Sequence, residues 1–114
     1  MSNEAQKILS LIESVDHTND SAMIRLNDEI YEWLLSIDPE TKFGRFVNSR
    51  DALKAIRPDG WSLHCIEFGS CSFIKNRVDG NGPLVILRSD DLYQEELAEL
   101  HAIIQAIEYE RTQK

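Results

Sequence analysis

The sequence predicts an α+β fold in which amphipathic helices pack with a small antiparallel β-sheet, a central hairpin plus a third strand. Apolar residues recur at helical spacing towards both ends of the chain. In the middle they alternate with polar residues on either side of the pair Gly69-Ser70, as in a β-hairpin. With 114 residues, 42% of them apolar and 28% charged, the chain is expected to form a single domain over residues 1–114.

Two helices are expected in the first third of the chain. The first covers residues 3–15, where one face is apolar: Ala5, Ile8, Leu9, Ile12 and Val15. After a polar linker, Asp20 or Ser21 is expected to cap a second helix over residues 22–37. Its apolar stripe consists of Met23, Leu26, Ile30, Trp33, Leu34 and Ile37. Asp38-Pro39 ends this helix, because the residue before a proline is driven out of the helical region.

A short third helix is expected before the hairpin. The segment 48–51 places a capping residue before a carboxylate, and Ala52, Leu53 and Ile56 then fall on one side of a helix. The turn Pro58-Asp59-Gly60 closes it.

Three strands are expected in the middle of the chain. The first begins at Trp61 and alternates until Cys65, where the phase changes, which indicates a bulge or burial on both faces. A two-residue turn at Gly69-Ser70 then leads to a second strand over residues 71–78. After a turn over residues 79–83, the apolar run 84–87 predicts the third strand.

The predicted hairpin register separates the two cysteines. It pairs Phe68 with Cys71 and Cys65 with Ile74, so the two thiols would point to opposite faces of the sheet. We therefore expect no disulfide, and two cysteines are in any case too few for a disulfide framework.

A final helix of some 20 residues is expected to follow a cap at Ser89, Asp90 or Asp91. Glu95 and Glu96 suit the positive end of its dipole. Its predicted buried stripe consists of Tyr93, Leu97, Leu100, Ile103, Ile104 and Ile107.

With these elements placed, the segment 46–61 resembles a pattern in the phage ABA-sandwich family of small phage and prophage proteins. It carries an aromatic strand end, the short-helix motif Ser49-Arg50-Asp51-Ala52 and the turn Pro58-Asp59-Gly60-Trp61. Leu26-Asn27-Asp28-Glu29-Ile30 is similar to the opening of that family's second helix. The resemblance implies an α/β/α-sandwich-like arrangement and a phage or prophage origin, and it implies no particular activity.

The sequence predicts a cytoplasmic protein, which for a phage or prophage protein means the bacterial host cell. No apolar run approaches the roughly 18 residues that a membrane span needs. The first residues, MSNEAQK, also lack the basic and then apolar order of a signal peptide. We expect no association with membranes.

No residue pattern predicts catalysis, a metal or a cofactor. A zinc site from His64, Cys65, Cys71 and His101 would lack the closely spaced ligand pairs that zinc sites normally use. His64 and Cys65 are adjacent on a strand and would point to opposite faces, so they cannot act as a catalytic pair. The loop 79–82 is not followed by the Gly-Lys-Ser/Thr ending of a phosphate-binding loop. We therefore expect a protein that is not an enzyme.

Charge is distributed unevenly along the chain, whose net charge is −8. Residues 1–40 carry nine acids against two bases, residues 41–88 eight bases against four acids, and residues 89–114 seven acids against two bases. The interpretation we favour is internal complementarity, with acidic helices lying near a basic hairpin.

Two charged surfaces remain as candidates for partner binding. The acidic surface, a candidate partner surface, consists of Asp28, Glu29, Glu32, Glu95, Glu96 and Glu99. The basic surface, a candidate nucleic-acid surface with Phe43, Phe46 and Trp61 nearby, consists of Lys42, Arg45, Arg50, Lys54 and Arg57.

The leading hypothesis is a non-enzymatic phage or prophage accessory protein that binds another protein, from the host, from the phage, or a second copy of itself as a homodimer. One alternative is an acidic anti-defence inhibitor whose carboxylates mimic phosphates in the groove of a host nuclease. The other is a weak nucleic-acid binder that uses the basic surface. The net charge of −8 disfavours this last alternative.

Overall fold

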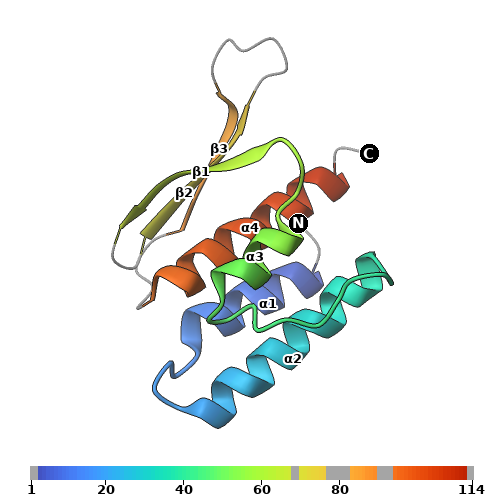
Figure 1. Cartoon of the computed structure of the whole chain (residues 1–114), viewed down its shortest axis with the longest axis vertical. Coiled ribbons are helices and arrows are strands. Elements are labelled where there is room, and N and C mark those ends of the chain that lie inside the picture. The colour runs from blue at the N-terminus through green and yellow to red at the C-terminus, as the bar shows by residue number, and fades with distance from the viewer. Residues whose placement is uncertain (1–2, 68–69, 77–82, 90–93, 113–114) are drawn as a thin grey trace.

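The computed structural model describes residues 3–67, 70–76, 83–89 and 94–112 (Figure 1). The elements follow in the order α1 (Asn3–Ser14), α2 (Asp20–Ile37), α3 (Arg50–Ile56), β1 (Trp61–Glu67), β2 (Ser70–Asn76), β3 (Pro83–Ser89) and α4 (Glu95–Thr112). The helices together contain more than twice as many residues as the strands.

Side-chain caps fix where α2 and α3 begin. Asn19 Oδ1 accepts a hydrogen bond of 3.0 Å from the backbone N–H of Ala22, so Asn19 caps α2 and not Asp20 or Ser21 as predicted. Ser49 Oγ accepts from the N–H of Ala52 at 3.4 Å and caps α3. At the other end of α2, Asp38 has an extended conformation, as expected before Pro39.

The three strands form an antiparallel sheet in the order β1-β2-β3. A register irregularity lies between Leu63 and Cys65, which confirms the bulge predicted near Cys65. The predicted pairing of Phe68 with Cys71 is wrong, because Ser70 already belongs to β2 and pairs with Glu67. The connection between these strands therefore comes one residue earlier than predicted, at residues 68–69, which lie outside the described part of the chain.

The later strand boundaries also differ from the prediction. β2 ends at Asn76, which pairs with Pro83, so β3 begins at the proline that was assigned to a turn. β3 then continues two residues beyond the predicted end, to Ser89. The predicted turn over residues 79–82 and the predicted helix caps Asp90 and Asp91 lie outside the described residues.

Helix α4 is buried around its whole circumference. One side packs on the sheet and another on α1 and α3, while α2 packs on α1 and lies farthest from the sheet (Figure 1). The buried residues of α4 are Leu97, Ala98, Glu99, Leu100, Ala102, Ile103, Ile104, Ala106 and Glu108. A single apolar stripe was predicted here, but a helix covered on more than one side buries residues all round.

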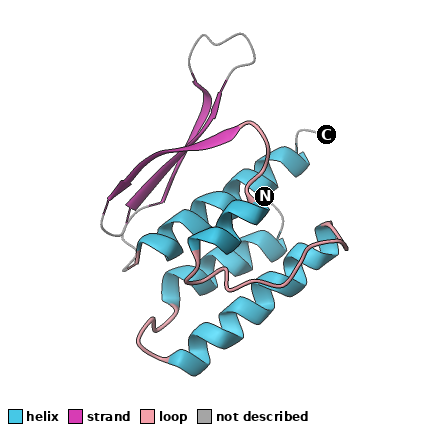
Figure 2. Cartoon of the chain, in the orientation of Figure 1, coloured by secondary structure: helices cyan, strands magenta, loops and turns pink. Residues whose placement is uncertain are grey.

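The predicted fold class, a sheet-centred α/β/α-sandwich-like α+β fold, is wrong. The chain is mostly helical, and the helices gather on one face of the strands (Figure 2). Among the described side chains, Trp61 is the only buried core hydrophobe that comes from a strand. The physical reason is that α1 and α3 bury their apolar faces against α4, so no described helix covers the second face of the sheet.

Polar contacts attach the sheet to the C-terminal half of α4. The indole Nε1 of Trp61 donates to Glu110 Oε1 at 2.8 Å, and Lys75 Nζ donates to the same oxygen at 2.6 Å. The Trp61 ring also meets Tyr109 edge-on, with the ring centroids 5.7 Å apart. These contacts fix the strands relative to the helix.

Truncation of α4 tests its central position. Ile103→Ala removes a fully buried side chain, so we expect the free energy of unfolding to fall by about 2–5 kcal/mol. Urea denaturation followed by circular dichroism measures this loss. The matched control is Ile24→Ala, at a side chain that is 63% exposed, where the change should stay within about 0.5 kcal/mol. Equal losses in both variants would contradict the burial pattern.

Candidate interaction surface

Two large apolar side chains are exposed in the described part of the chain. Ile24 on α2 is 63% exposed, and Phe43 in the connection between α2 and α3 is 60% exposed. They line one groove of about 430 Å³, together with Asp20, Met23, Asn27, Asp28, Arg45, Val47 and Asn48. We refer to this groove and its two apolar residues as the Ile24–Phe43 surface.

A buried asparagine holds the α2–α3 connection against α2. Asn27 is 5% exposed, and its Nδ2 donates to the carbonyl oxygen of Gly44 at 2.9 Å. Its Oδ1 accepts from the N–H of Val47 at 3.2 Å. A Cβ atom at Gly44 would lie 3.0 Å from Ala52 Cβ and 3.3 Å from the Phe46 ring, so the close approach of the chain here requires glycine.

Aromatic packing fixes the position of Phe43. Its ring meets Tyr31 edge-on, with centroids 5.1 Å apart and planes at 89°. Phe46, which is 1% exposed, anchors the same connection in the core. Phe43 is therefore supported from below while its outer part faces solvent, and binding a partner would need little ordering of this segment.

Both signs of charge line the Ile24–Phe43 surface. Asp20 and Asp28 are exposed on α2, one turn before and one turn after Ile24. Arg45 is exposed on the α2–α3 connection, two residues after Phe43. The groove thus has an acidic helix side and a basic loop side.

The six residues of the predicted acidic surface do not form one surface. Glu29 and Glu32 line a different groove, of about 320 Å³, between α1 and α2, whereas Asp28 lines the Ile24–Phe43 surface. On α4, Glu95 pairs with Arg50 at 2.6 Å, while Glu96 is half-buried. Glu99 is 2% exposed and cannot offer its charge to a partner, which corrects its assignment to this surface.

The predicted basic surface is also divided. Arg50 and Arg57 pair with α4, Arg57 Nη2 lying 3.9 Å from Glu99 Oε2, and Lys54 is near enough to act on the charge of Glu99. Lys42 and Arg45 lie exposed in the α2–α3 connection. Internal charge complementarity is therefore present: it joins the α3 segment to α4, and among the described side chains Lys75 of β2 joins the sheet to Glu110 of α4.

Glu99 occupies an unusual electrostatic position. Burial raises the pKa of its carboxyl group, and the positive charges of Arg57 and Arg50 offset this increase only in part. Its Oε2 atom has no hydrogen-bond partner. The folded chain therefore tolerates the ionised form of Glu99 less well than the unfolded chain does.

The variant Glu99→Gln tests whether burying the ionised Glu99 carboxylate destabilises the folded chain. A carboxyl group whose pKa is raised by folding stabilises the protein below its ordinary value of 4.5 and loses that contribution as the pH rises. The variant should therefore be more stable than the wild type at pH 7, and the difference should shrink as the pH falls towards 4. Urea titrations at both pH values measure it, and a variant that is less stable at pH 7 would show that the pair with Arg57 outweighs burial.

A hydrogen-bonded chain of serine, histidine and glutamate joins three elements. Ser89 Oγ lies 2.7 Å from His101 Nδ1, and His101 Nε2 lies 3.0 Å from Glu13 Oε2. Gln105 Nε2 also donates to Ser89 Oγ at 3.1 Å. Sequence reasoning considered Ser89 as a helix cap and His101 as a possible zinc ligand, and it did not connect the two because no spacing signal links positions so far apart.

This chain resembles a catalytic triad only in composition. Ser89 is 2% exposed, and none of the described grooves is lined by its side chain, so a substrate could not reach the hydroxyl group. The contacts instead tie β3 to α4 and α1.

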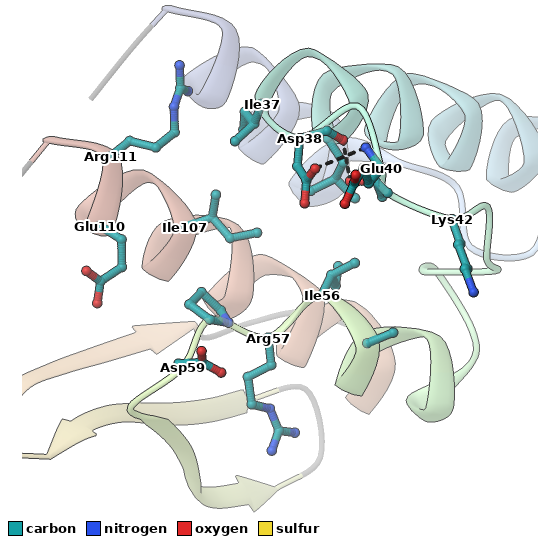
Figure 3. Close-up of a pocket in the computed structure, with 14 residues that line it drawn as sticks. Ile37, Asp38, Glu40, Lys42, Ile56, Arg57, Asp59, Ile107, Glu110 and Arg111 are labelled. Atoms are coloured by element: carbon teal, nitrogen blue, oxygen red, sulfur yellow. Dashed lines mark hydrogen bonds between the residues drawn. The ribbon is translucent and has the colours of Figure 1, made fainter. Parts of the chain in front are cut away.

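A cleft of about 560 Å³ lies between the ends of α2, α3 and α4 (Figure 3). Ile37, Ile56 and Ile107 form apolar walls. The charged groups of Arg57 and Arg111 point away from the centre of the cleft in Figure 3. Charged residues of several separate segments also line the cleft, namely Asp38, Glu40, Lys42, Asp59 and Glu110, and we assign no ligand to it.

Neither a metal site nor a membrane span is found in the described residues. They contain no group of three histidine, cysteine or acidic side chains placed to hold a metal ion. None of their helices combines the length and the apolar character needed to cross a bilayer. The side chains of His64, Cys65 and Cys71, which were weighed as zinc ligands, lie outside the described set.

Comparison with known proteins gives no relative for this chain: no family model, curated protein or solved structure matches it. The resemblance to the phage ABA-sandwich family therefore remains a prediction from the sequence.

Asn27→Ala tests the support of the Ile24–Phe43 surface. The change leaves the carbonyl group of Gly44 and the N–H of Val47 without their partner, so we expect a loss of about 1–3 kcal/mol of stability. Hydrogen exchange at Val47 should accelerate as well. The control is Asn48→Ala, at an exposed residue of the same connection, and equal exchange at Val47 in both variants would contradict the role of Asn27.

Proposed function

We propose that this chain is a non-enzymatic phage or prophage accessory protein that acts in the cytoplasm of its bacterial host by binding another protein molecule. The observation that carries the proposal is the joint exposure of Ile24 and Phe43 at one groove. Large exposed apolar groups that share a groove are typical of protein-binding sites. Exposed apolar residues that are isolated from one another are common on protein surfaces and do not indicate a binding site.

The properties of the Ile24–Phe43 surface suit protein recognition. Aromatic side chains at the centre of an interface commonly supply most of its binding energy, and Phe43 is held in place by Tyr31. Charged residues at the rim contribute specificity and orientation, and Asp20, Asp28 and Arg45 have this position.

Charge mimicry by the acidic surface has less support. A phosphate mimic needs a continuous row of accessible carboxylates, but Glu99 is buried and Glu95 is paired with Arg50. The acids of α2 are themselves divided, since Asp28 lines the Ile24–Phe43 surface and Glu29 and Glu32 line the groove beside α1.

Nucleic-acid binding has less support for a similar reason. Arg50 and Arg57 pair with carboxylates of α4, which leaves Lys42, Arg45 and Lys54 as the members of the basic surface with no carboxylate partner among the ion pairs described. The net charge of −8 opposes the approach of a polyanion.

Phe43→Ser tests the proposal. We expect it to weaken partner binding at least roughly 30-fold, the effect of losing a side chain worth about 2 kcal/mol. The tagged protein is cross-linked in producing cells, and the products are quantified by mass spectrometry against Gln6→Ala, a control at an exposed residue of α1.

The experiment has a clear contrary outcome. Products formed by the wild type and by Gln6→Ala but lost with Phe43→Ser would support the proposal. Products unaffected by Phe43→Ser, or no protein product of any kind including a cross-linked second copy, would overturn it.

A further inference from the structure

We infer that the occupant of the Ile24–Phe43 surface is a second copy of this chain, bound about a two-fold axis. This inference rests on the proposed function and specifies its partner. Homodimers with two-fold symmetry are the commonest closed assemblies, and they require one patch that is complementary to itself. The described residues of this surface meet that requirement in both charge and apolar character.

The charge layout is self-complementary. Asp20 and Asp28 lie on the α2 side of the groove, and Arg45 lies on the loop side. A two-fold axis that runs along the groove, in the plane of the interface, places the α2 side of one copy over the loop side of the other. Asp28 of one copy then faces Arg45 of the second copy, and the same contact occurs a second time by symmetry.

The same two-fold axis also brings the apolar residues of the two copies together. Ile24 belongs to the helix side and Phe43 to the loop side, so each Ile24 meets the Phe43 of the other copy. Side chains that are 63% and 60% exposed in the single chain would thereby leave water in both copies. The groove of about 430 Å³ leaves room for apolar side chains of the second copy.

A partner of uniform charge fits this surface less well. A basic segment would pair with Asp20 and Asp28 but would place like charge against Arg45, and an acidic segment would do the reverse. A second copy of the chain carries both signs of charge at this surface, so it can pair with Asp28 and with Arg45 at the same time. Because Asn27 and Tyr31 hold the loop side in position, pairing requires little ordering of the chain.

The net charge sets the conditions of the test. Two copies of charge −8 repel each other at long range, and salt at about 0.15 M screens such repulsion beyond roughly 8 Å. The contact between Asp28 and Arg45 acts at shorter range. Sedimentation equilibrium at this salt concentration, over a wide range of protein concentrations, therefore measures the dimer under suitable conditions.

A charge swap tests the pairing directly. Asp28→Arg and Arg45→Asp each place like charges opposite each other at two symmetric positions, and we expect each to weaken dimerisation at least about tenfold. The double variant carries both changes and restores opposite charges across the axis, so its dimerisation should return close to the wild-type level. Phe43→Ser should give a monomer. Circular dichroism and thermal unfolding confirm that each variant is folded, since all three residues are exposed.

The contrary outcomes are separate from those of the proposed function. A wild-type chain that stays monomeric at every concentration overturns the inferred dimer. A dimer that Phe43→Ser leaves intact overturns the inference that the Ile24–Phe43 surface forms it. Single variants that weaken the dimer without rescue in the double variant overturn the two-fold pairing of Asp28 with Arg45. If the chain is monomeric but Phe43→Ser still abolishes cross-linking to a different protein, the proposed function stands and only the identity of the partner is wrong.

Discussion

The burial of α4 on several sides is the constraint on which the rest of the structure depends. An 18-residue helix that packs on a sheet and on two helices must satisfy or neutralise every polar group that it carries inward. Its alanines allow close neighbours, and its buried acids meet arginines: Glu99 faces Arg57, and Glu108 pairs with Arg111 at 2.6 Å. Arg57 and Arg111 thus have a structural role.

This arrangement determines which part of the molecule remains available to a partner. α1 and α3 pack on α4, and α2 packs on α1 at the side far from the sheet (Figure 1). The α2–α3 connection packs on one face of α2. The two hydrogen bonds of Asn27 hold it there. The connection leaves part of this face of α2 in contact with solvent, and Ile24 and Phe43 are exposed there.

Sequence reasoning found the local features and missed the arrangement in space. Periodicity located α1, α2 and the bulge in β1, because these depend on near neighbours along the chain. It could not show which elements share a face, so a helix packed on several sides was taken for one with a single stripe. Glu99 was assigned to the acidic surface as a candidate phosphate mimic, although carboxylates are rarely buried and the structure buries this one. Ile24 lies off the predicted stripe, and Phe43 was considered only beside the basic residues.

The distribution of charge explains why an apolar surface, and not a charged one, is the better candidate for binding. An acidic–basic–acidic order along the chain suggests an exposed field, but Arg50 and Arg57 meet Glu95 and Glu99 once the helices pack. Charges that are paired with opposite charges of the same chain contribute little to the attraction of a distant partner. What remains at the Ile24–Phe43 surface is a balanced set of both signs around two apolar side chains. Such a set orients a contact without favouring a polyanion or a polycation.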